Sequence, residues 1–254
     1  MYVPSKSVLA EPLFVGNGFE EAELCALLRH AKNGIRIMDV GANIGLYTTT
    51  LAKTIGPGGR VWSFEPFPAI AAYLNKNIEA NSLSNVTIVQ SAVADAQGKA
   101  KFHVYPFGSD VYNSLGASYR PVENIRADST IVVDVTTLDS FANINGIEKI
   151  DMLKIDVEGA EERVLRGAEQ LLHRSDRLMV LAELGVDSAR QCGCSVPRTI
   201  EMMANWGFGT FRLGVNMCFV KVEQFPDEGG YAFFIKDAYI THLKNAGGLT
   251  SLKF

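Results

Sequence analysis

Acidic side chains recur at the ends of short apolar runs in this 254-residue sequence. Asp39 and Glu65 fall at the ends of two such runs, and Asp156 and Glu183 at the ends of two later ones. Runs of this length are typical of buried strands in a parallel sheet, whose carboxyl ends share the edge where ligands bind. We therefore expect these carboxylates to gather around one crevice, where they can bind cations, accept hydroxyl protons or act as bases.

A glycine-rich turn follows the first of these runs. Residues 39–45 read Asp-Val-Gly-Ala-Asn-Ile-Gly and join a predicted strand to a predicted helix. Glycines there permit a tight turn and close approach of a ligand to the backbone, although a plain connection between strand and helix has the same form. Glu65, 20 residues after Gly45, is placed to accept hydrogen bonds from both hydroxyls of a ribose. Together they predict a site for an adenosine-containing ligand.

Two ligands compete for this site, a nicotinamide dinucleotide and S-adenosylmethionine. A dinucleotide carries a pyrophosphate, which an acid such as Asp39 beside the turn would repel. S-adenosylmethionine instead carries a sulfonium and an ammonium, which that acid attracts. The turn also has the pattern Gly-x-Asn-x-Gly rather than the Gly-x-Gly-x-x-Gly of dinucleotide sites. We therefore favour S-adenosylmethionine.

A second group of charged residues surrounds Asp156. Lys154 and Asp156 share one side of a predicted strand, and Glu158 follows at the start of the next helix. Asp156 or Glu158 could orient or deprotonate a substrate hydroxyl, while the same acids could also simply cap the helix. Methyl transfer chiefly requires in-line alignment of nucleophile and methyl group. Asp156 with Glu183 could also hold a hydrated divalent ion, which is the less favoured alternative.

The elements that must position these residues alternate between strand and helix, the order expected of βαβ units in a parallel sheet. An amphipathic helix over 20–31 precedes them, within an N-terminal extension over 1–34, and residues 35–254 form the main domain. We predict strands at 35–40, 60–65, 86–93, 151–156, 178–183, 207–213 and 231–235, and helices at 45–55, 68–81, 159–173 and 197–206.

An insertion follows the third predicted strand. Runs at 99–104 and 131–136 predict an extra β-hairpin, and the 26 residues over 105–130 separate its arms. So long a connection in a compact domain is functional or disordered. Its aromatic content and few charges favour a lid or substrate loop.

Composition excludes several classes. The chain has 24 Lys+Arg against 28 Asp+Glu, a net charge of -4, so no basic excess is present for binding nucleic acid. No apolar run reaches the ~18 residues of a membrane span and no leader pattern opens the chain, so we expect a cytoplasmic protein. Four cysteines are too few for a disulfide scaffold. No pattern specifies an oligomeric state.

Four segments together resemble one family. They are IMDVGANIGLYT (37–48), FEPFP (64–68), TTLDSF (136–141) and LKIDVEGAEERVLRGA (153–168). In this order and spacing they resemble the FkbM-type S-adenosylmethionine-dependent methyltransferases. The resemblance implies an α/β fold: a Rossmann-like class I methyltransferase sheet of seven strands, the last antiparallel, with helices on both faces.

The resemblance also implies roles for particular residues. Around the cofactor, it implies contacts to the methionine part, the ribose and the adenine. These are Asp39, Gly41, Asn43 and Gly45 for the methionine, Glu65 for the ribose, and Ser91 and Ala92 for the adenine, with Ala42, Pro66 and Asp156 as further cofactor contacts. Asp156 and Glu158, with Lys154 beside them, would face the reaction centre, and Ser114 lies in an Asn-Ser-Leu element of the long loop.

The implied activity is methylation of a hydroxyl on a sugar or other small natural product. Tyr112 and Tyr119 would shape the acceptor site, because aromatic faces stack on sugar rings and apolar rings. Ser114 and Glu183 are further candidates for acceptor contact. Open alternatives are methylation of an amine or peptide nitrogen, a catalytically silent cofactor-binding protein and, least favoured, a nicotinamide oxidoreductase.

Overall fold

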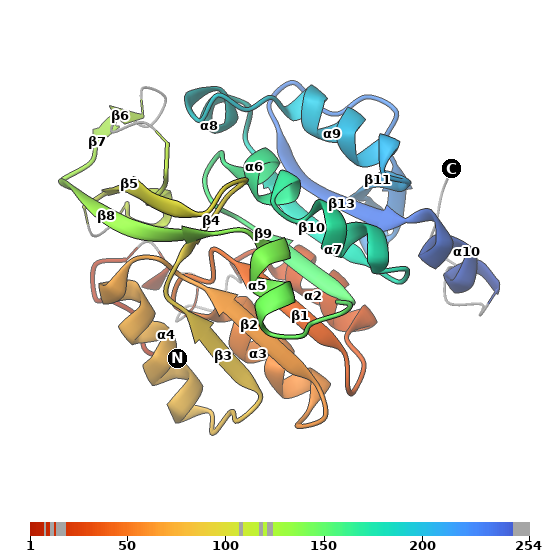
Figure 1. Ribbon diagram of the computed structural model, residues 1–254, viewed down its shortest axis with the longest axis horizontal. Coiled ribbons are helices and arrows are strands. Elements are labelled where there is room, and N and C mark those ends of the chain that lie inside the picture. Colours follow the sequence, from red (N-terminus) through yellow and green to blue (C-terminus); the bar gives the residue numbers. More distant parts are fainter. Residues whose placement is uncertain are drawn as a thin grey trace.

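The computed structural model describes residues 1–7, 9–10, 13, 19–106, 109–116, 119–120 and 124–245. Within them the central sheet has eight strands, in the order β12-β11-β13-β10-β9-β1-β2-β3 (Figure 1). These strands are β1 (Arg36–Val40), β2 (Arg60–Phe64), β3 (Val86–Val89), β9 (Met152–Ile155), β10 (Met179–Leu184), β11 (Phe208–Leu213), β12 (Phe219–Lys221) and β13 (Gly230–Lys236).

The strand directions match the predicted sheet. β1 runs parallel to β2 and β9, and β9 runs parallel to β10. β13, the last strand in the chain, lies between β10 and β11 and is antiparallel to both. The predicted count of seven strands is wrong, because β12 pairs antiparallel with β11 and adds an eighth. Three residues are too few to show strand alternation in the sequence.

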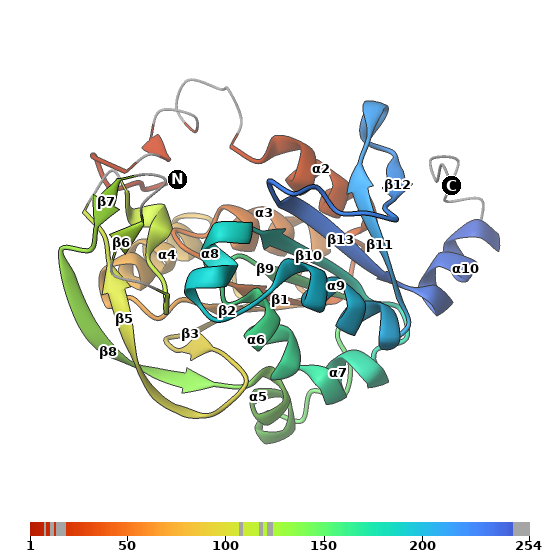
Figure 2. The same cartoon turned by 90° about the horizontal axis from the view of Figure 1, so that it is seen from above.

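Helices cover both faces of the sheet, as Figure 2 shows. One face carries α2 (Glu21–His30) and α3 (Leu46–Ile55), and the other carries α5 (Leu138–Ile144), α6 (Glu161–Arg166), α7 (Glu169–Arg174) and α9 (Val196–Asn205). The described part of the chain also contains the helices α4 (Pro68–Ala80), α8 (Val186–Gln191) and α10 (Asp237–Asn245).

Alternation along each strand divides the core between these two layers. In β1, Met38 and Val40 pack with α5, α6 and α7, whereas Ile37 packs with α2 and α3. In β9, Leu153 and Ile155 face the layer of α5, α6 and α7, and Met152 faces the layer of α2 and α3. Both faces are therefore apolar, which explains why the strands appear in the sequence as continuous apolar runs.

Two predicted elements are divided in the structure. The third strand, predicted over 86–93, bends at Ser91, and β4 (Ala92–Val93) leaves the central sheet to pair with an inserted strand. The helix predicted over 159–173 is broken at Gly167 into α6 and α7. A Cβ on Gly167 would lie 2.1 Å from the carbonyl oxygen of Ala94, so this position packs directly against backbone. The Gly167 carbonyl accepts a hydrogen bond from the Asp139 amide at 2.9 Å.

The insertion after β3 contains the paired strands β5 (Gly98–Val104) and β8 (Ser129–Thr136), which are antiparallel over their whole length. With β4 they form a three-stranded sheet beside the carboxyl end of β3 (Figure 1). Between them lie the 3-10 turn η1 (Asp110–Tyr112) and a short pair, β6 (Tyr119–Arg120) with β7 (Ile125–Arg126). None of the helices in the described ranges is long and apolar enough to cross a bilayer.

Candidate active site

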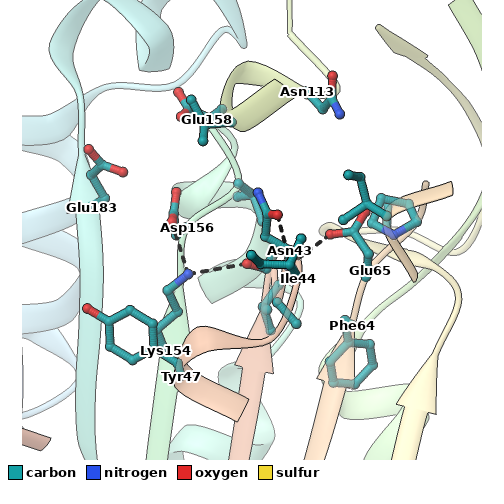
Figure 3. A pocket seen from close by; sticks show the side chains of 18 of the residues that line it. Asn43, Ile44, Tyr47, Phe64, Glu65, Asn113, Lys154, Asp156, Glu158 and Glu183 are labelled. Carbon is teal, nitrogen blue, oxygen red and sulfur yellow. Dashed lines mark hydrogen bonds and ion pairs between the residues drawn. The ribbon is translucent and has the colours of Figure 1, made fainter. Parts of the chain in front are cut away.

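A cavity of ≈ 320 Å³ lies over the carboxyl ends of β1, β2, β9 and β10 (Figure 3). Most predicted site residues line it. They are Gly41, Ala42, Asn43, Glu65, Pro66, Ser91, Ala92, Tyr112, Lys154, Asp156, Glu158 and Glu183. Asp39, Gly45 and Ser114 do not line it, and the side chain of Tyr119 lies outside the described part of the chain.

Strand register explains how the charged residues meet. Asp39 on β1 is in register with Lys154 on β9, and Lys154 with Leu181 on β10. Two residues further along each strand, on the same side, lie Gly41, Asp156 and Glu183. Glu183 in turn pairs with Tyr231 of β13. One row of side chains thus crosses the sheet at its carboxyl edge.

The glycine-rich turn is shaped by two close approaches. Gly41 has φ 78°, and a Cβ there would lie 1.7 Å from the carbonyl oxygen of Asp156, so the ends of β1 and β9 touch through backbone. Gly45 has φ 92°, and a Cβ there would meet the Leu74 side chain at 2.5 Å. Gly45 therefore allows the turn to pack on α4 and does not line the cavity, and its expected ligand contact stays a prediction.

Glu65 is held by two backbone amides. Its Oε2 accepts from the Asn43 amide at 3.0 Å and its Oε1 from the Phe67 amide at 2.9 Å. Burial raises the pKa of Glu65 to about 7, against the opposing effect of these two amides. Each carboxylate oxygen can accept a further hydrogen bond, so the fixed carboxylate can serve the two hydroxyls of a ribose.

Asp39 does not line the cavity, and its expected contact with the cofactor stays a prediction. It shares the face of β1 that packs under α3, and its side chain is 0% exposed. The Thr48 hydroxyl donates to Asp39 Oδ2 at 2.6 Å and lies 2.7 Å from the Ser63 hydroxyl. Burial raises the pKa of Asp39, while the charge of Lys154 lowers it. Asp39 therefore acts on the site through Lys154.

Lys154 links the turn to Asp156. Its ammonium donates to Asp156 Oδ2 at 2.9 Å and to the Gly41 carbonyl at 3.2 Å, both drawn in Figure 3. Burial on its own would lower the pKa of Lys154, but the carboxylates of Asp156, Asp39 and Glu20 raise it overall. Lys154 therefore stays cationic and fixes the Asp156 carboxylate.

Glu158 has a cationic partner of its own. Its Oε2 accepts from Arg120 Nη1 at 2.8 Å, and the Arg120 guanidinium lies 4.5 Å from the centre of the Tyr112 ring. Glu158 adopts a left-handed backbone, φ 59°, which aims it over the cavity opposite Lys154 (Figure 3). Burial, with the charge of Asp156, raises the pKa of Glu158 to about 8 although Arg120 lowers it.

Asp156, Glu158 and Glu183 form one group in the described chain, with a ligand atom from each lying within 4.8 Å of the others. Burial, followed by the charges of Asp156 and Glu158, raises the pKa of Glu183 to about 10. Oxygen ligands at this spacing suit a divalent ion. Lys154 and Arg120 already neutralise two of the three carboxylates.

The inserted loop reaches the cavity through Tyr112 and Asn113. Ser114 is buried, and its backbone exchanges two hydrogen bonds with His103 at 2.9 and 3.2 Å, which anchors the loop to β5. Ser114 therefore holds the loop in place and does not line the cavity, and its expected acceptor contact stays a prediction.

Among the ionisable residues that line the cavity, the sequence prediction missed three, Glu20, Tyr47 and Tyr231. Tyr47 lies in the first turn after the glycine-rich segment, and that proximity was a usable signal. Glu20 lies before the whole sheet in the sequence, where no local pattern connects it to the site.

The sheet order, the antiparallel last strand and a cavity above the glycine-rich turn define a class I methyltransferase domain, the class that uses S-adenosylmethionine. The same fold occurs in the O-methyltransferase TomG from Streptomyces achromogenes, solved in complex with S-adenosylmethionine, with a TM-score of 0.51 and 13% identity over 93% of this chain and 91% of that chain. The model of the FkbM methyltransferase domain matches residues 39–233, and the chain belongs to that family.

Relatives of known name agree with this assignment. The chain is 29% identical over 147 residues to the 2-O-methyltransferase NoeI of Sinorhizobium fredii, covering 55% of this chain and 59% of that protein. It is 30% identical over 187 residues to the 31-O-demethyl-FK506 methyltransferase FkbM of Streptomyces tacrolimicus, covering 64% and 71%. The chain spans less than two thirds of the length of NoeI.

Proposed function

We propose that this protein is an S-adenosylmethionine-dependent methyltransferase that methylates a hydroxyl group of a sugar or other small natural product. The observation that carries the proposal is the single cavity in which Glu65 and the glycine-rich turn lie next to Asp156 and Glu158. The names of two relatives, a 2-O-methyltransferase and a 31-O-demethyl-FK506 methyltransferase, support oxygen as the acceptor atom.

The cavity's charge fits a cationic cofactor. Five lining residues are carboxylic acids, namely Glu20, Glu65, Asp156, Glu158 and Glu183, and Lys154 is the one Lys or Arg among the described lining residues. A pyrophosphate would meet repulsion here, whereas a sulfonium with an ammonium would be attracted. Glu65 with Pro66 would hold the ribose, Ser91 and Ala92 would border the adenine, and the turn at Gly41, Ala42 and Asn43 would lie beneath the sulfur.

Bound S-adenosylmethionine supplies an electrophilic methyl group on its sulfonium. The chain's own task is to align the acceptor hydroxyl and remove its proton. Asp156 or Glu158 takes that proton, with Lys154 holding the first carboxylate in position and Arg120 the second. Because Lys154 and Arg120 already balance these charges, we favour a reaction that needs no metal.

The acceptor enters beneath the inserted loop. Tyr112 offers an aromatic face to a sugar or apolar ring, and Arg120 behind it fixes the ring. Tyr119 and Glu183 complete the proposed acceptor contacts, and Ser114 anchors the loop that carries Tyr112.

The test is to incubate the protein with methyl-labelled S-adenosylmethionine and fractionated metabolites of its host. We expect a labelled small molecule whose mass rises by one methyl and whose fragmentation places the methyl on oxygen. Heat-denatured protein serves as the control for background labelling. A methyl on nitrogen would overturn the hydroxyl assignment. Failure of S-adenosylmethionine and S-adenosylhomocysteine to bind in calorimetry would overturn the proposal altogether.

A further inference from the structure

Glu20 lines the active-site cavity although it precedes α2 and lies outside residues 39–233, which match the family model. Its carboxyl lies close enough to Lys154, Asp156, Tyr47 and Tyr231 to interact electrostatically with each of them. Figure 3 shows Tyr47, Lys154 and Asp156 together on one side of the cavity and Glu65 on the other. Glu20 therefore belongs to the side away from the proposed ribose position.

Two buried polar atoms at this side of the cavity are poorly satisfied. Glu20 Oε2 and the Tyr47 hydroxyl make no hydrogen bond of ordinary geometry within the described structure, although the Glu20 carboxyl lies near the hydroxyls of Tyr47 and Tyr231. Lys154, the nearby cation, is committed to Asp156 and the Gly41 carbonyl. A buried carboxylate without a cationic partner costs free energy, so this group suits a ligand that brings its own positive charge.

The backbone of Glu20 is a second, independent observation. Glu20 has φ 51° and ψ 35°, a left-handed conformation that is uncommon outside glycine. Six described residues other than glycine have a positive φ, and three of them, Glu20, Asn43 and Glu158, line this one cavity. Backbone strain of this kind concentrates at functional sites, where the surrounding structure holds it.

We propose that Glu20 binds the α-ammonium group of the cofactor's amino-acid end, with the Tyr47 hydroxyl as a second hydrogen-bonding group for the same end. This inference rests on the proposed function, because it takes S-adenosylmethionine as the cofactor. With the adenosine at Glu65, Ser91 and Ala92, the amino-acid arm extends across the turn toward β9, where Tyr47 and Glu20 lie. The acceptor would then bind at the opposite wall of the cavity, which Glu158 and Tyr112 form.

A consequence concerns the N-terminal segment. Leu9 and Phe19 line the same cavity as Glu20. The segment before β1, expected from the sequence as an extension to the methyltransferase domain, then completes the cofactor site with one charged and two apolar side chains. Cofactor affinity would depend on residues that the family model does not include.

The experiment compares two ligands by calorimetry on the full chain. S-adenosylhomocysteine carries the amino-acid end, and 5′-methylthioadenosine lacks it while keeping the adenosine. We expect Glu20→Gln to weaken S-adenosylhomocysteine about 10- to 100-fold and to leave 5′-methylthioadenosine unchanged, because only the first ligand brings a charge to Glu20. Tyr47→Phe should show the same selectivity with a smaller loss. Glu65→Gln is the matched control and should weaken both ligands alike.

Two results would overturn the inference while leaving the proposed function intact. One is normal affinity of Glu20→Gln for S-adenosylhomocysteine together with a raised acceptor KM, which would place Glu20 in the acceptor site. The other is an equal loss for both ligands, which would make Glu20 a structural residue. If the unmodified protein bound neither ligand, the proposed function would fail and this inference with it. Unchanged circular dichroism spectra would show that each variant folds.

Discussion

At the scale of single residues, backbone donors fix the orientation of the Glu65 carboxyl and burial changes its pKa. Two amides fix both of its oxygens, while burial raises its pKa to about 7. The acid form carries a proton on one oxygen and is a poorer acceptor for two ribose hydroxyls than the carboxylate. Cofactor binding should therefore depend on the ionisation of this one group.

We predict that affinity for S-adenosylhomocysteine rises with pH through about 7, as Glu65 loses its proton. Glu65→Gln should reduce the binding free energy by about 1.5–3 kcal/mol at pH 8, the usual contribution of a charged hydrogen bond. The variant should also lose the pH dependence near 7, because glutamine does not titrate. Calorimetry between pH 6 and pH 8 measures both effects. A variant that keeps the wild-type pH profile would remove Glu65 from the cofactor site.

Glu158 governs a second titration, on the acceptor side. Its pKa is raised to about 8, so the ionised fraction of Glu158 increases as the pH rises through this range. We predict that kcat/KM rises with pH through about 8, since the carboxylate is the form that accepts a proton from a hydroxyl or supports Asp156 in doing so. Glu158→Gln should lower kcat by about 10²–10⁴ and flatten this rise. It should leave the affinity for S-adenosylhomocysteine within about twofold.

The comparison with Asp156→Asn separates the two candidate bases. If Asp156 is the base, its variant loses turnover while the pH dependence near 8 persists in the residual rate. A rise near pH 8 that survives in Glu158→Gln would contradict the role assigned to Glu158.

The residues that the sequence placed correctly in the cavity are those whose position follows from a strand end. Asp156 and Glu65 come directly after β9 and β2, and parallel strands end at one edge. Asp39 lies one residue before the end of β1, where Thr48 of α3 covers it, so it does not line the cavity. Glu20 was missed because only the tertiary fold brings it to the site.

At the scale of elements, the alternating pattern located the main strands and helices because each strand is buried on both faces and each connection is short. The sequence could not show where an element breaks for a tertiary contact. Gly167 lies within a helical apolar pattern, and the reason for the break is the backbone of Ala94 from another layer. β4 pairs with β8 instead of continuing in the central sheet, and β8 follows the inserted loop, so the residues around β4 do not reveal its partner.

We predict that Gly167→Ala lowers the free energy of unfolding by about 1–3 kcal/mol, because the added Cβ would overlap the Ala94 carbonyl oxygen at 2.1 Å. Gly58→Ala is the matched control, since the nearest side-chain atom to its added Cβ, at 3.4 Å, is the end of Asn33. That variant should stay within about 0.5 kcal/mol of the unmodified protein. Urea unfolding measures both. Equal stability of the two variants would show that α6 and α7 can shift away from β4.

At the scale of the whole molecule, the net charge of -4 conceals a local arrangement. Five acids line one cavity that contains one described lysine, and the helical layers on both sides of the sheet keep that edge in place. Several of these acids are buried with raised pKa values, so burial disfavours their ionised form in the ligand-free protein, and a cationic ligand would favour that ionised form. Binding of a cationic ligand should therefore increase the free energy of unfolding of the whole domain.

The magnitude follows from mass action. A ligand present at 100 times its Kd stabilises the native state by about 2.7 kcal/mol when the unfolded chain does not bind it. For a domain of this size, each kcal/mol raises Tm by about 2–4 °C. We predict that S-adenosylhomocysteine at that concentration raises Tm by about 5–10 °C in a thermal melt, and that the same concentration of NAD raises it by less than about 1 °C. NAD is the informative control, because it shares the adenosine and differs in carrying a pyrophosphate, which the carboxylates of this cavity repel. A comparable shift with NAD would mean that the cavity recognises adenosine alone and that its acidic walls do not select a cationic cofactor.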